Sequence, residues 1–186
     1  MRLLIASDIH GSSFWTEKLL KRIDEENPDM VVLLGDLLYH GPRNALSEKY
    51  DTAITAALLN GIKEKLLCVK GNCDSDVDQC VLDFPIMAEY AVFVVNGHRV
   101  YATHGDKFNK ENPPQLMQGD ILLNGHFHVH EVSLFNTGKN IYLNPGSVSI
   151  PKGGSAHSYA MIDDDVMSIM SLENRNVIAS NDKWLR

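Results

Sequence analysis

Three short apolar segments alternate with two helix-like segments in the first third of the chain, and this alternation constrains the fold more than any other feature. The apolar segments, which have the length of buried strands, are residues 3–6, 30–34 and 66–69. The first helix-like segment follows Ser12 and Ser13, either of which can cap a helix, and it stops at Pro28. The second covers about residues 48–60 and precedes Gly61. This order predicts an α/β protein with parallel strands and right-handed crossovers.

The second half of the chain, from Tyr90 onwards, is predicted to be rich in strands. Residues 91–95 and 99–103 flank Asn96-Gly97, the favoured two-residue turn of a β-hairpin. Further strands and turns are expected at residues 121–124, 132–135, 141–143, 159–162 and 166–170, at Thr137-Gly138, and at Asp163-Asp164-Asp165. Because the 186 residues contain no repeat, linker or low-complexity tract, we expect a single domain over residues 1–186.

Charge and cysteine content restrict the partners and the compartment. The chain has 17 basic and 24 acidic side chains, a net charge of -7. Nucleic-acid polymers and anionic membranes bind basic surfaces, so neither is expected as a partner, whereas a local site can still bind a small phosphorylated substrate. The three cysteines have no framework spacing and predict reduced thiols in a cytoplasmic protein. No signal peptide or membrane span is predicted, and a homo-oligomer is left open.

Polar residues follow the predicted strands at five points along the chain. These fragments are Asp8-x-His10, Gly35-Asp36, Gly71-Asn72, His104-Gly105 and Gly125-His126-x-His128. Ligand sites in open α/β sheets lie outside the carboxyl ends of strands, so we expect the fragments to meet at one edge. In extended chain, residues i and i+2 point the same way. Asp8 with His10, and His126 with His128, can therefore each serve one centre.

The residue types in these fragments are those of metal ligands. Two carboxylates, one amide and four imidazoles offer seven oxygen and nitrogen donors. A tetrahedral zinc ion takes about four ligands, so seven fit better to two divalent ions that share a carboxylate, as in two-metal hydrolases. Two such ions, two carboxylates and a bridging hydroxide leave one positive charge, which favours a phosphate ester as substrate.

Each fragment alone also has a simpler structural explanation. Asp8 and Asn72 can cap a helix or close a turn, and Gly35-Asp36 is typical of a turn. His126 and His128 can be outward-facing residues of an edge strand. All of these explanations would have to hold together, and the combined pattern therefore favours the metal site.

Taken in this order, the fragments resemble the calcineurin-like metallophosphoesterase superfamily. Over residues 3–165 the chain is similar to small bacterial phosphodiesterases of that family, and the likeness extends to residues 40–46, 71–79 and 144–154. The resemblance implies an αββα two-sheet sandwich with a dinuclear site at one edge. It implies one metal ion held by Asp8, His10, Asp36 and His128, and a second held by Asp36, Asn72, His104 and His126. Relatives commonly use Mn²⁺, with Zn²⁺, Fe and Ni²⁺ as alternatives.

The resemblance also implies catalytic roles. A hydroxide that bridges the metals attacks phosphorus in line. Asn72 contacts a phosphoryl oxygen, and Asp74 orients a ligand imidazole. Many members of the family have a histidine where this chain has Cys73. A thiol with a pKa of about 8.5 is a poor acid for a leaving oxygen at neutral pH, so we expect activity on esters with good leaving groups, such as aryl phosphodiesters. Cys73 as a small filler beneath the site is the alternative.

Two cationic residues lie in loops of the same segments. Arg43 is a candidate contact of the substrate phosphate, and a solvated loop arginine is the alternative. Lys152 lies in the glycine-rich segment 151–155, which lacks the P-loop pattern and receives no phosphate-binding role. The sequence predicts a dinuclear metal-dependent phosphodiesterase that acts on small phosphodiesters. The alternatives are a phosphomonoesterase, including a phosphoprotein phosphatase, and a non-catalytic scaffold on the same fold.

Overall fold

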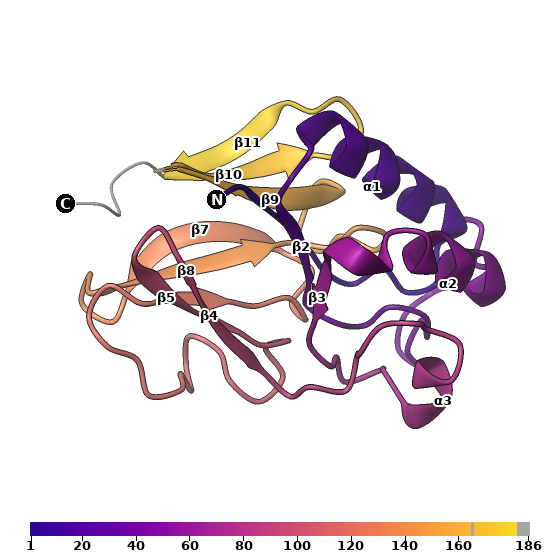
Figure 1. The fold of residues 1–186 in the computed structure, drawn as a ribbon, viewed down its shortest axis with the longest axis horizontal. Coiled ribbons are helices and arrows are strands. Elements are labelled where there is room, and N and C mark those ends of the chain that lie inside the picture. Colours follow the sequence, from indigo (N-terminus) through magenta and orange to yellow (C-terminus); the bar gives the residue numbers. More distant parts are fainter. Residues whose placement is uncertain (165, 182–186) are drawn as a thin grey trace.

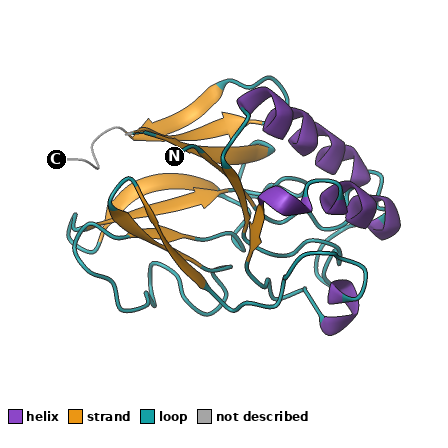
Figure 2. Ribbon diagram, in the orientation of Figure 1, coloured by secondary structure: helices purple, strands orange, loops and turns teal. Residues whose placement is uncertain are grey.

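Two β-sheets lie face to face, and the long helices cover one outer side (Figures 1 and 2). The computed structural model describes residues 1–164 and 166–181, so Asp165 of the predicted turn and the end of the predicted domain lie outside the described residues. The first sheet contains β1 (Leu3–Ala6), β2 (Met30–Leu33), β3 (Leu66–Cys68), β9 (Ser158–Asp163), β10 (Val166–Ser171) and β11 (Val177–Asn181). The second contains β4 (Ala91–Val95), β5 (His98–Ala102), β6 (Ile121–Leu123), β7 (His130–Phe135) and β8 (Asn140–Pro145).

Each sheet contains three neighbouring parallel strands, at one end of the first sheet and in the middle of the second. The orders are β11-β10-β9-β1-β2-β3 and β4-β5-β6-β8-β7. In the first sheet β1 pairs with β2, and β2 with β3, in parallel. In the second sheet β6 lies parallel to both β5 and β8. The carboxyl ends of these parallel strands are the ends from which the predicted polar fragments follow.

The helices begin at side-chain caps. In α1 (Ser13–Glu26) the Ser12 hydroxyl accepts a hydrogen bond from the Trp15 amide, as predicted from the serines there. The helix α2 (Thr52–Asn60) begins four residues later than predicted, because the Asp51 side chain caps it and Lys49 has a left-handed φ of 46°. The short elements η1 (Lys63–Lys65) and α3 (Asp76–Gln79) were not predicted, although the sequence signal of α3 is a capping box between Ser75 and Asp78.

Alternation along β1 divides the interior into two cores. Leu4 and Ala6 face the layer of helices, where they join Trp15 and Leu19 of α1. Leu3 and Ile5 belong to the second core, which fills the space between the two sheets. Because both faces of β1 are buried, the strand is uniformly apolar in sequence.

Loop residues pack on part of the outer side of the second sheet. Residues 103–120 form turns and bends. The Phe108 ring packs edge-on against Tyr101 at 6.4 Å, and the Lys110 ammonium lies 4.9 Å from the centre of the Tyr142 ring. The predicted two-sheet sandwich is thus confirmed, with loop packed against the second sheet.

Two further predictions concern helices and cysteines. Within residues 1–164 and 166–181, no helix is long and apolar enough to cross a membrane. Cys68, Cys73 and Cys80 are all free thiols.

Candidate metal centre

The loops at the carboxyl edge of the sheets hold an uncommon backbone conformation. Five of the predicted site residues have φ angles between 47° and 64°, namely Asp8, His10, Asp36, His126 and His128. Non-glycine residues rarely adopt this left-handed region, which costs about 1–3 kcal/mol each. Backbone hydrogen bonds from Asp8 N to the Gly35 oxygen (3.1 Å) and from His10 N to the Asp36 oxygen (2.9 Å) hold two of these loops together.

One half of the site consists of Asp8, His10 and His128. The Nδ1 atoms of His10 and His128 lie 2.7 Å from the Tyr39 carbonyl and 2.5 Å from the Ile150 carbonyl, so each Nδ1–H donates to backbone. In the neutral ring the lone pair is then on Nε2. The two Nε2 atoms face each other at 3.3 Å, where two lone pairs cannot form a hydrogen bond.

A cation fits between these lone pairs. Oδ1 of Asp8 lies 3.2 Å from His128 Nε2 and 3.6 Å from His10 Nε2. This oxygen is buried and has no hydrogen-bond partner among the described residues. A buried carboxylate oxygen without a donor is costly unless a positive charge faces it. The three groups therefore form an arrangement suited to a divalent ion.

The other half of the site is built around His104. Its Nδ1 lies 2.6 Å from the Leu34 carbonyl, which leaves the Nε2 lone pair directed into the site. Around this Nε2 lie Asn72 Oδ1 at 3.1 Å, His126 Nδ1 at 3.3 Å and Asp36 Oδ2 at 3.5 Å. Oxygen and imidazole donors of this kind suit borderline and hard divalent ions.

Asp36 connects the two halves. Its Oδ2 lies 3.7 Å from His10 Nε2 in the first half and 3.5 Å from His104 Nε2 in the second. Its Oδ1 accepts a hydrogen bond from the Cys73 amide at 2.8 Å, which fixes the orientation of the carboxylate. One carboxylate oxygen that faces both halves is the geometry of a bridging ligand.

The buried carboxylates favour positive charge at the imidazoles. Burial alone would lower the pKa of His104, but Asp36 and Asp8 outweigh it and raise this pKa to about 10. Burial alone would raise the pKa of Asp8, yet the imidazoles of His10 and His128 hold it well below the ordinary value of 3.8. Either protons or metal ions can supply the positive charge that the buried carboxylates favour.

Gly71 and Gly125 permit the close approach of the loops. A Cβ on Gly71 would lie 2.2 Å from Asp36 Oδ1, and a Cβ on Gly125 would lie 1.9 Å from Ser7 Oγ and 2.8 Å from Asp8 Oδ2. Any side chain at either position would displace a carboxylate of the site.

The structure corrects the i, i+2 argument in part. Asp8 and His10 do lie in one half of the site, although their backbone is left-handed and not extended. His126 and His128 separate, since His126 lies beside His104 and His128 beside His10. The spacing could not reveal this division because it depends on left-handed φ angles.

Asp74 has a different role from the one predicted. Its carboxylate accepts hydrogen bonds from the amides of Asp36 (2.8 Å), Leu37 (2.8 Å) and Gly71 (2.7 Å), and not from an imidazole. The three oriented imidazoles of His10, His104 and His128 donate to backbone carbonyls, which sequence reasoning could not identify. Asp74 therefore holds together the loops that carry Asp36 and Asn72.

Asn72, Cys73 and Arg43 border a cavity beside the site. The cavity has a volume of about 300 Å³ and its walls include Asp36, Arg43, Asn72, Cys73, His126, His128 and Lys152. The Cys73 sulfur, which the sequence did not suggest as a ligand, lies within 4.8 Å of donor atoms of His10 and Asp36. Burial and the charge of Asp36 raise the pKa of the Cys73 thiol to about 12, so it stays protonated at neutral pH.

This fold and this site define the class of the protein. The sequence model of the calcineurin-like phosphoesterase superfamily domain matches residues 1–166. The chain belongs to this family, and it is a metallophosphoesterase, a hydrolase of phosphoric esters.

Particular relatives are similar over nearly the whole chain. Phosphodiesterase YfcE of Escherichia coli K12 is 46% identical over 179 residues, 96% of each chain. The solved structure of the E. coli phosphoesterase YfcE superposes with a TM-score of 0.95 at 44% identity, covering 98% of this chain and 99% of that one. The zinc complex of Vps29 from Entamoeba histolytica shares the fold, with a TM-score of 0.60 at 19% identity and coverage of 97% of both chains.

Proposed function

We propose that this protein is a dinuclear metal-dependent phosphodiesterase that hydrolyses small phosphodiesters. The observation that carries the proposal is the position of Asp36, whose Oδ2 faces His10 in one half of the site and His104 in the other. The similarity to E. coli YfcE, named as a phosphodiesterase, supports the diester as the substrate.

The donor set divides naturally between two ions. Asp8, His10 and His128 with Asp36 would hold one, and His104, His126 and Asn72 with Asp36 would hold the other. We infer Mn²⁺ because the donors are oxygen and imidazole nitrogen, and because the protonated Cys73 thiol is a weak ligand. The ions supply Lewis acidity toward phosphoryl oxygens and a nucleophile at neutral pH.

The residues of the chain orient the substrate and fix the donors. The Asn72 side chain lies at the exposed mouth, with Oδ1 toward His104 and Nδ2 toward Cys73, so its amide is placed to contact a phosphoryl oxygen. Asp74 holds the Asp36 and Gly71 loops by their amides. Arg43 lines the adjoining cavity, where it is placed to bind the substrate.

Three predictions about the location and partners of the enzyme remain part of this proposal. A reducing, cytoplasmic location is supported by the free state of Cys68, Cys73 and Cys80. The net charge of -7 supports a small substrate over a nucleic-acid polymer or a membrane surface. Self-association is to be checked by sedimentation velocity.

Hydrolysis of bis(p-nitrophenyl) phosphate by the metal-stripped protein, with and without added Mn²⁺, tests the activity. We expect a rate that depends on Mn²⁺ between pH 6 and pH 9, and two bound ions per chain by elemental analysis. Absence of a metal-dependent rate across this range would favour the scaffold. One ion per chain at saturation would overturn the dinuclear site. Faster hydrolysis of p-nitrophenyl phosphate than of the diester would favour a phosphomonoesterase.

A further inference from the structure

Asn72 separates two hollows at the mouth of the site, and their charges differ. The larger, of about 300 Å³, is lined by Arg43 and Lys152 together with His126 and His128. The smaller, of about 220 Å³, is lined by Lys70, Glu89, Asp106 and Lys107. A diester presents a substituent on each side of its phosphorus, so the two hollows offer different environments to the two substituents.

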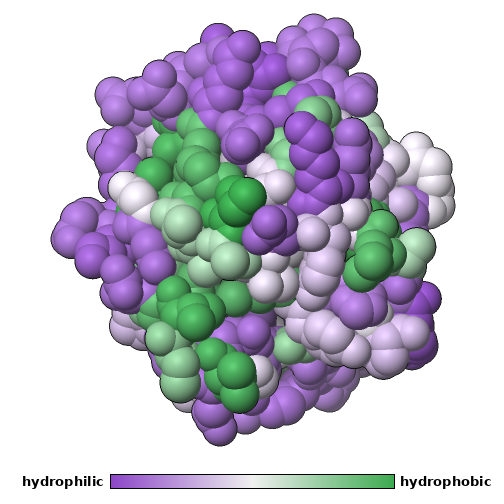
Figure 3. Space-filling view, turned by 90° about the vertical axis from the view of Figure 1, so that its right-hand side faces the viewer, coloured by the Kyte–Doolittle hydropathy of each residue, from purple (hydrophilic) through white to green (hydrophobic). Residues whose placement is uncertain are grey.

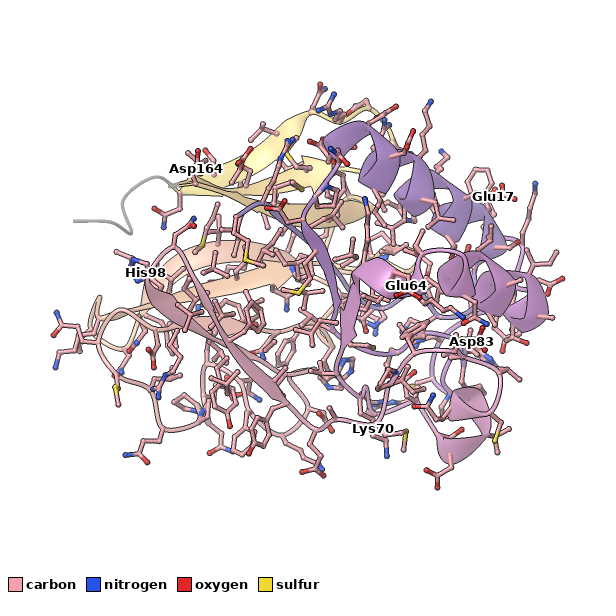
Figure 4. All side chains as sticks on the ribbon, in the orientation of Figure 1. Glu17, Glu64, Lys70, Asp83, His98 and Asp164 are labelled. Atoms are coloured by element: carbon pink, nitrogen blue, oxygen red, sulfur yellow. The ribbon has the colours of Figure 1, made fainter. Side chains whose placement is uncertain are left out.

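The smaller hollow is balanced in charge. The Lys107 ammonium pairs with the Glu89 carboxylate at 2.6 Å, and Lys70 lies near enough to Glu89 to favour its ionised form. Asp106 lies in the same wall. Figure 4 shows Lys70 at the lower edge of the molecule, in the segment that follows β3. Two cations and two anions leave this side without a net preference for a charged group.

The larger hollow has unpaired positive charge. Among the described residues, neither the Arg43 guanidinium nor the Lys152 ammonium forms an ion pair or hydrogen bond. The acidic residue in this wall is Asp36, whose oxygens face the Cys73 amide and the imidazoles. The chain has a net charge of -7, so two unpaired cations beside the site give this wall a charge opposite in sign to that of the whole chain.

Hydrogen bonds stabilise the loops that carry both cations, and the Lys152 loop is bonded directly to His128 of the site. The Arg43 turn is closed by the Asn44 side chain, which donates to the His40 carbonyl at 2.8 Å. The Lys152 amide donates to the His128 carbonyl at 2.9 Å, while His128 Nδ1 contacts Ile150 in the same loop. The loop that orients His128 therefore also fixes the backbone of Lys152.

We propose that Arg43 and Lys152 together bind a second anionic group of the substrate, so that the preferred substrates are phosphodiesters with a further phosphate on one substituent. This inference rests on the proposed phosphodiesterase activity. The phosphoryl group that reacts carries one negative charge, which the ions, carboxylates and hydroxide of the proposed centre, with one net positive charge, would match. The two additional cations have no partner in that group, and a guanidinium with an ammonium is a typical phosphate-binding pair.

Two substrates with the same leaving group test the proposal. They are thymidine 5′-(p-nitrophenyl phosphate) and the same compound with a 3′-phosphate. For the Mn²⁺-loaded protein we expect the 3′-phosphate to raise kcat/KM about tenfold, chiefly through a lower KM, as charge-assisted hydrogen bonds of this kind do. The preference should shrink as salt is raised, because the cations are exposed.

Variants assign the preference to the two residues. Lys152→Ala and Arg43→Ala should each bring the ratio of the two kcat/KM values toward one, and Lys152→Arg should keep it. Lys139→Ala is the matched control. Lys139 is an exposed lysine directly before the first residue of β8, whereas the segment that carries Lys152 follows Pro145 at the other end of that strand. A ratio that is unchanged in Lys152→Ala and Arg43→Ala would overturn the assignment.

The outcomes separate this inference from the proposed activity. Hydrolysis of both substrates with equal kcat/KM overturns the anion site and leaves the phosphodiesterase intact. If neither substrate is hydrolysed, the proposed activity fails, and calorimetric binding of thymidine 3′,5′-bisphosphate and thymidine 5′-monophosphate decides the anion site. Tighter binding of the bisphosphate, lost in Lys152→Ala, supports the site, and equal affinity overturns it.

Discussion

Three imidazoles of the centre are oriented by backbone carbonyls, which is the main feature of the site at the scale of single residues. His10, His104 and His128 each place Nδ1 at 2.5–2.7 Å from a carbonyl oxygen. A hydrogen bond at Nδ1 sets the tautomer and leaves Nε2 free to bind a metal. Because these acceptors are main-chain atoms, no side-chain substitution removes them directly. The orientation of the donors is therefore a property of the loops.

The proposed restriction on the leaving group rests on Cys73. Its pKa of about 12, raised by burial and by Asp36, makes the thiol a poor proton donor to a departing oxygen. The sulfur lines the open cavity, so a larger side chain at this position has space to extend into it. We therefore propose that Cys73 restricts which esters are hydrolysed, whereas hydrolysis itself depends on the metal ligands.

Replacing Cys73 by histidine should extend activity to poorer leaving groups. For Cys73→His we expect turnover of alkyl-leaving phosphodiesters to rise by about 10²-fold, the low end of what a positioned general acid contributes. Rates across a series of phenols and alcohols as leaving groups measure this, and the dependence on leaving-group pKa should flatten. Cys73→Ser supplies no such acid and serves as the control. An unchanged or lower rate on alkyl esters would show that this position has no acid role.

At the scale of elements, the strands were predictable and the loops after them were not. Residues 3–6 form β1 as predicted, because an apolar tetrapeptide with both faces buried has one dominant signal. The left-handed φ angles of Asp8, His10 and Asp36 depend on hydrogen bonds between two loops that are distant in sequence. The strand pattern therefore identified the residues of the candidate site, whereas their division between its two halves was implied only by the family resemblance and not by the spacing.

Weak or competing local signals account for the elements that were missed. The strand β11 (Val177–Asn181) is mostly exposed or half-buried and has no regular apolar alternation. The helix α2 begins late because Asp51, and not a residue near 48, provides the cap. The loop over the second sheet depends on contacts such as Tyr101 with Phe108, which no local pattern encodes.

The loop after β6 must pass very close to the loop after β1, and Gly125 permits this. We expect Gly125→Ala to weaken Mn²⁺ binding by about 10- to 100-fold, because the new Cβ would collide with Ser7 and move the Asp8 carboxylate. Calorimetric titration of the metal-stripped variant measures the affinity. Gly61→Ala, where the nearest atom is the Leu58 oxygen at 3.2 Å, is the control. Binding within threefold of the wild type in folded Gly125→Ala would contradict the close-approach argument.

At the scale of the whole molecule, the candidate centre spans the two sheets. Asp8, Asp36 and Asn72 follow strands of the first sheet, and His104, His126 and His128 follow strands of the second. The distances between donors are therefore set by the core between the sheets, which includes Ile5 and Leu123. A substitution that alters the packing between the two sheets should therefore weaken metal binding even where each sheet keeps its own structure.

Part of the surface on the helical side of the molecule is apolar. On the side that carries α1 and α2, hydrophobic residues gather below the hydrophilic residues at the top of the view (Figure 3). An apolar groove of about 520 Å³ lies on α2 and α3, and its walls include Leu38, Ala53, Ala57, Val77 and Val81. Self-association of the chain into a homo-oligomer stays a prediction.

Ion pairs and a hydrogen bond of Glu26 link parts of the chain that are far apart in sequence. Its carboxylate, 2% exposed at the end of α1, pairs with Arg2 at 2.7 Å and with Arg175 at 2.5 Å. The Tyr159 hydroxyl of β9 donates to it at 3.0 Å. Burial alone would raise the pKa of Glu26, but the hydrogen bonds from Arg175 and Tyr159 outweigh it and hold this pKa below 4.5. The ionised carboxylate is thus more stable in the folded chain than in the unfolded one.

The stabilisation by Glu26 should depend on pH in a defined direction. A lowered pKa contributes stability above the unfolded value of about 4.3, and this contribution is lost as the pH falls through the folded value. At pH 7 we expect Glu26→Gln to lower the free energy of unfolding by about 2 kcal/mol, and this deficit to shrink as the pH falls from 7 to below about 4.3, toward the lowered pKa of the folded state. Urea denaturation across this range measures both effects. Glu17→Gln, at an exposed position of α1 labelled in Figure 4, should change stability by less than about 0.5 kcal/mol. A Glu26→Gln deficit that does not shrink as the pH falls below about 4.3 would mean that the carboxylate contributes through packing and not through its charge.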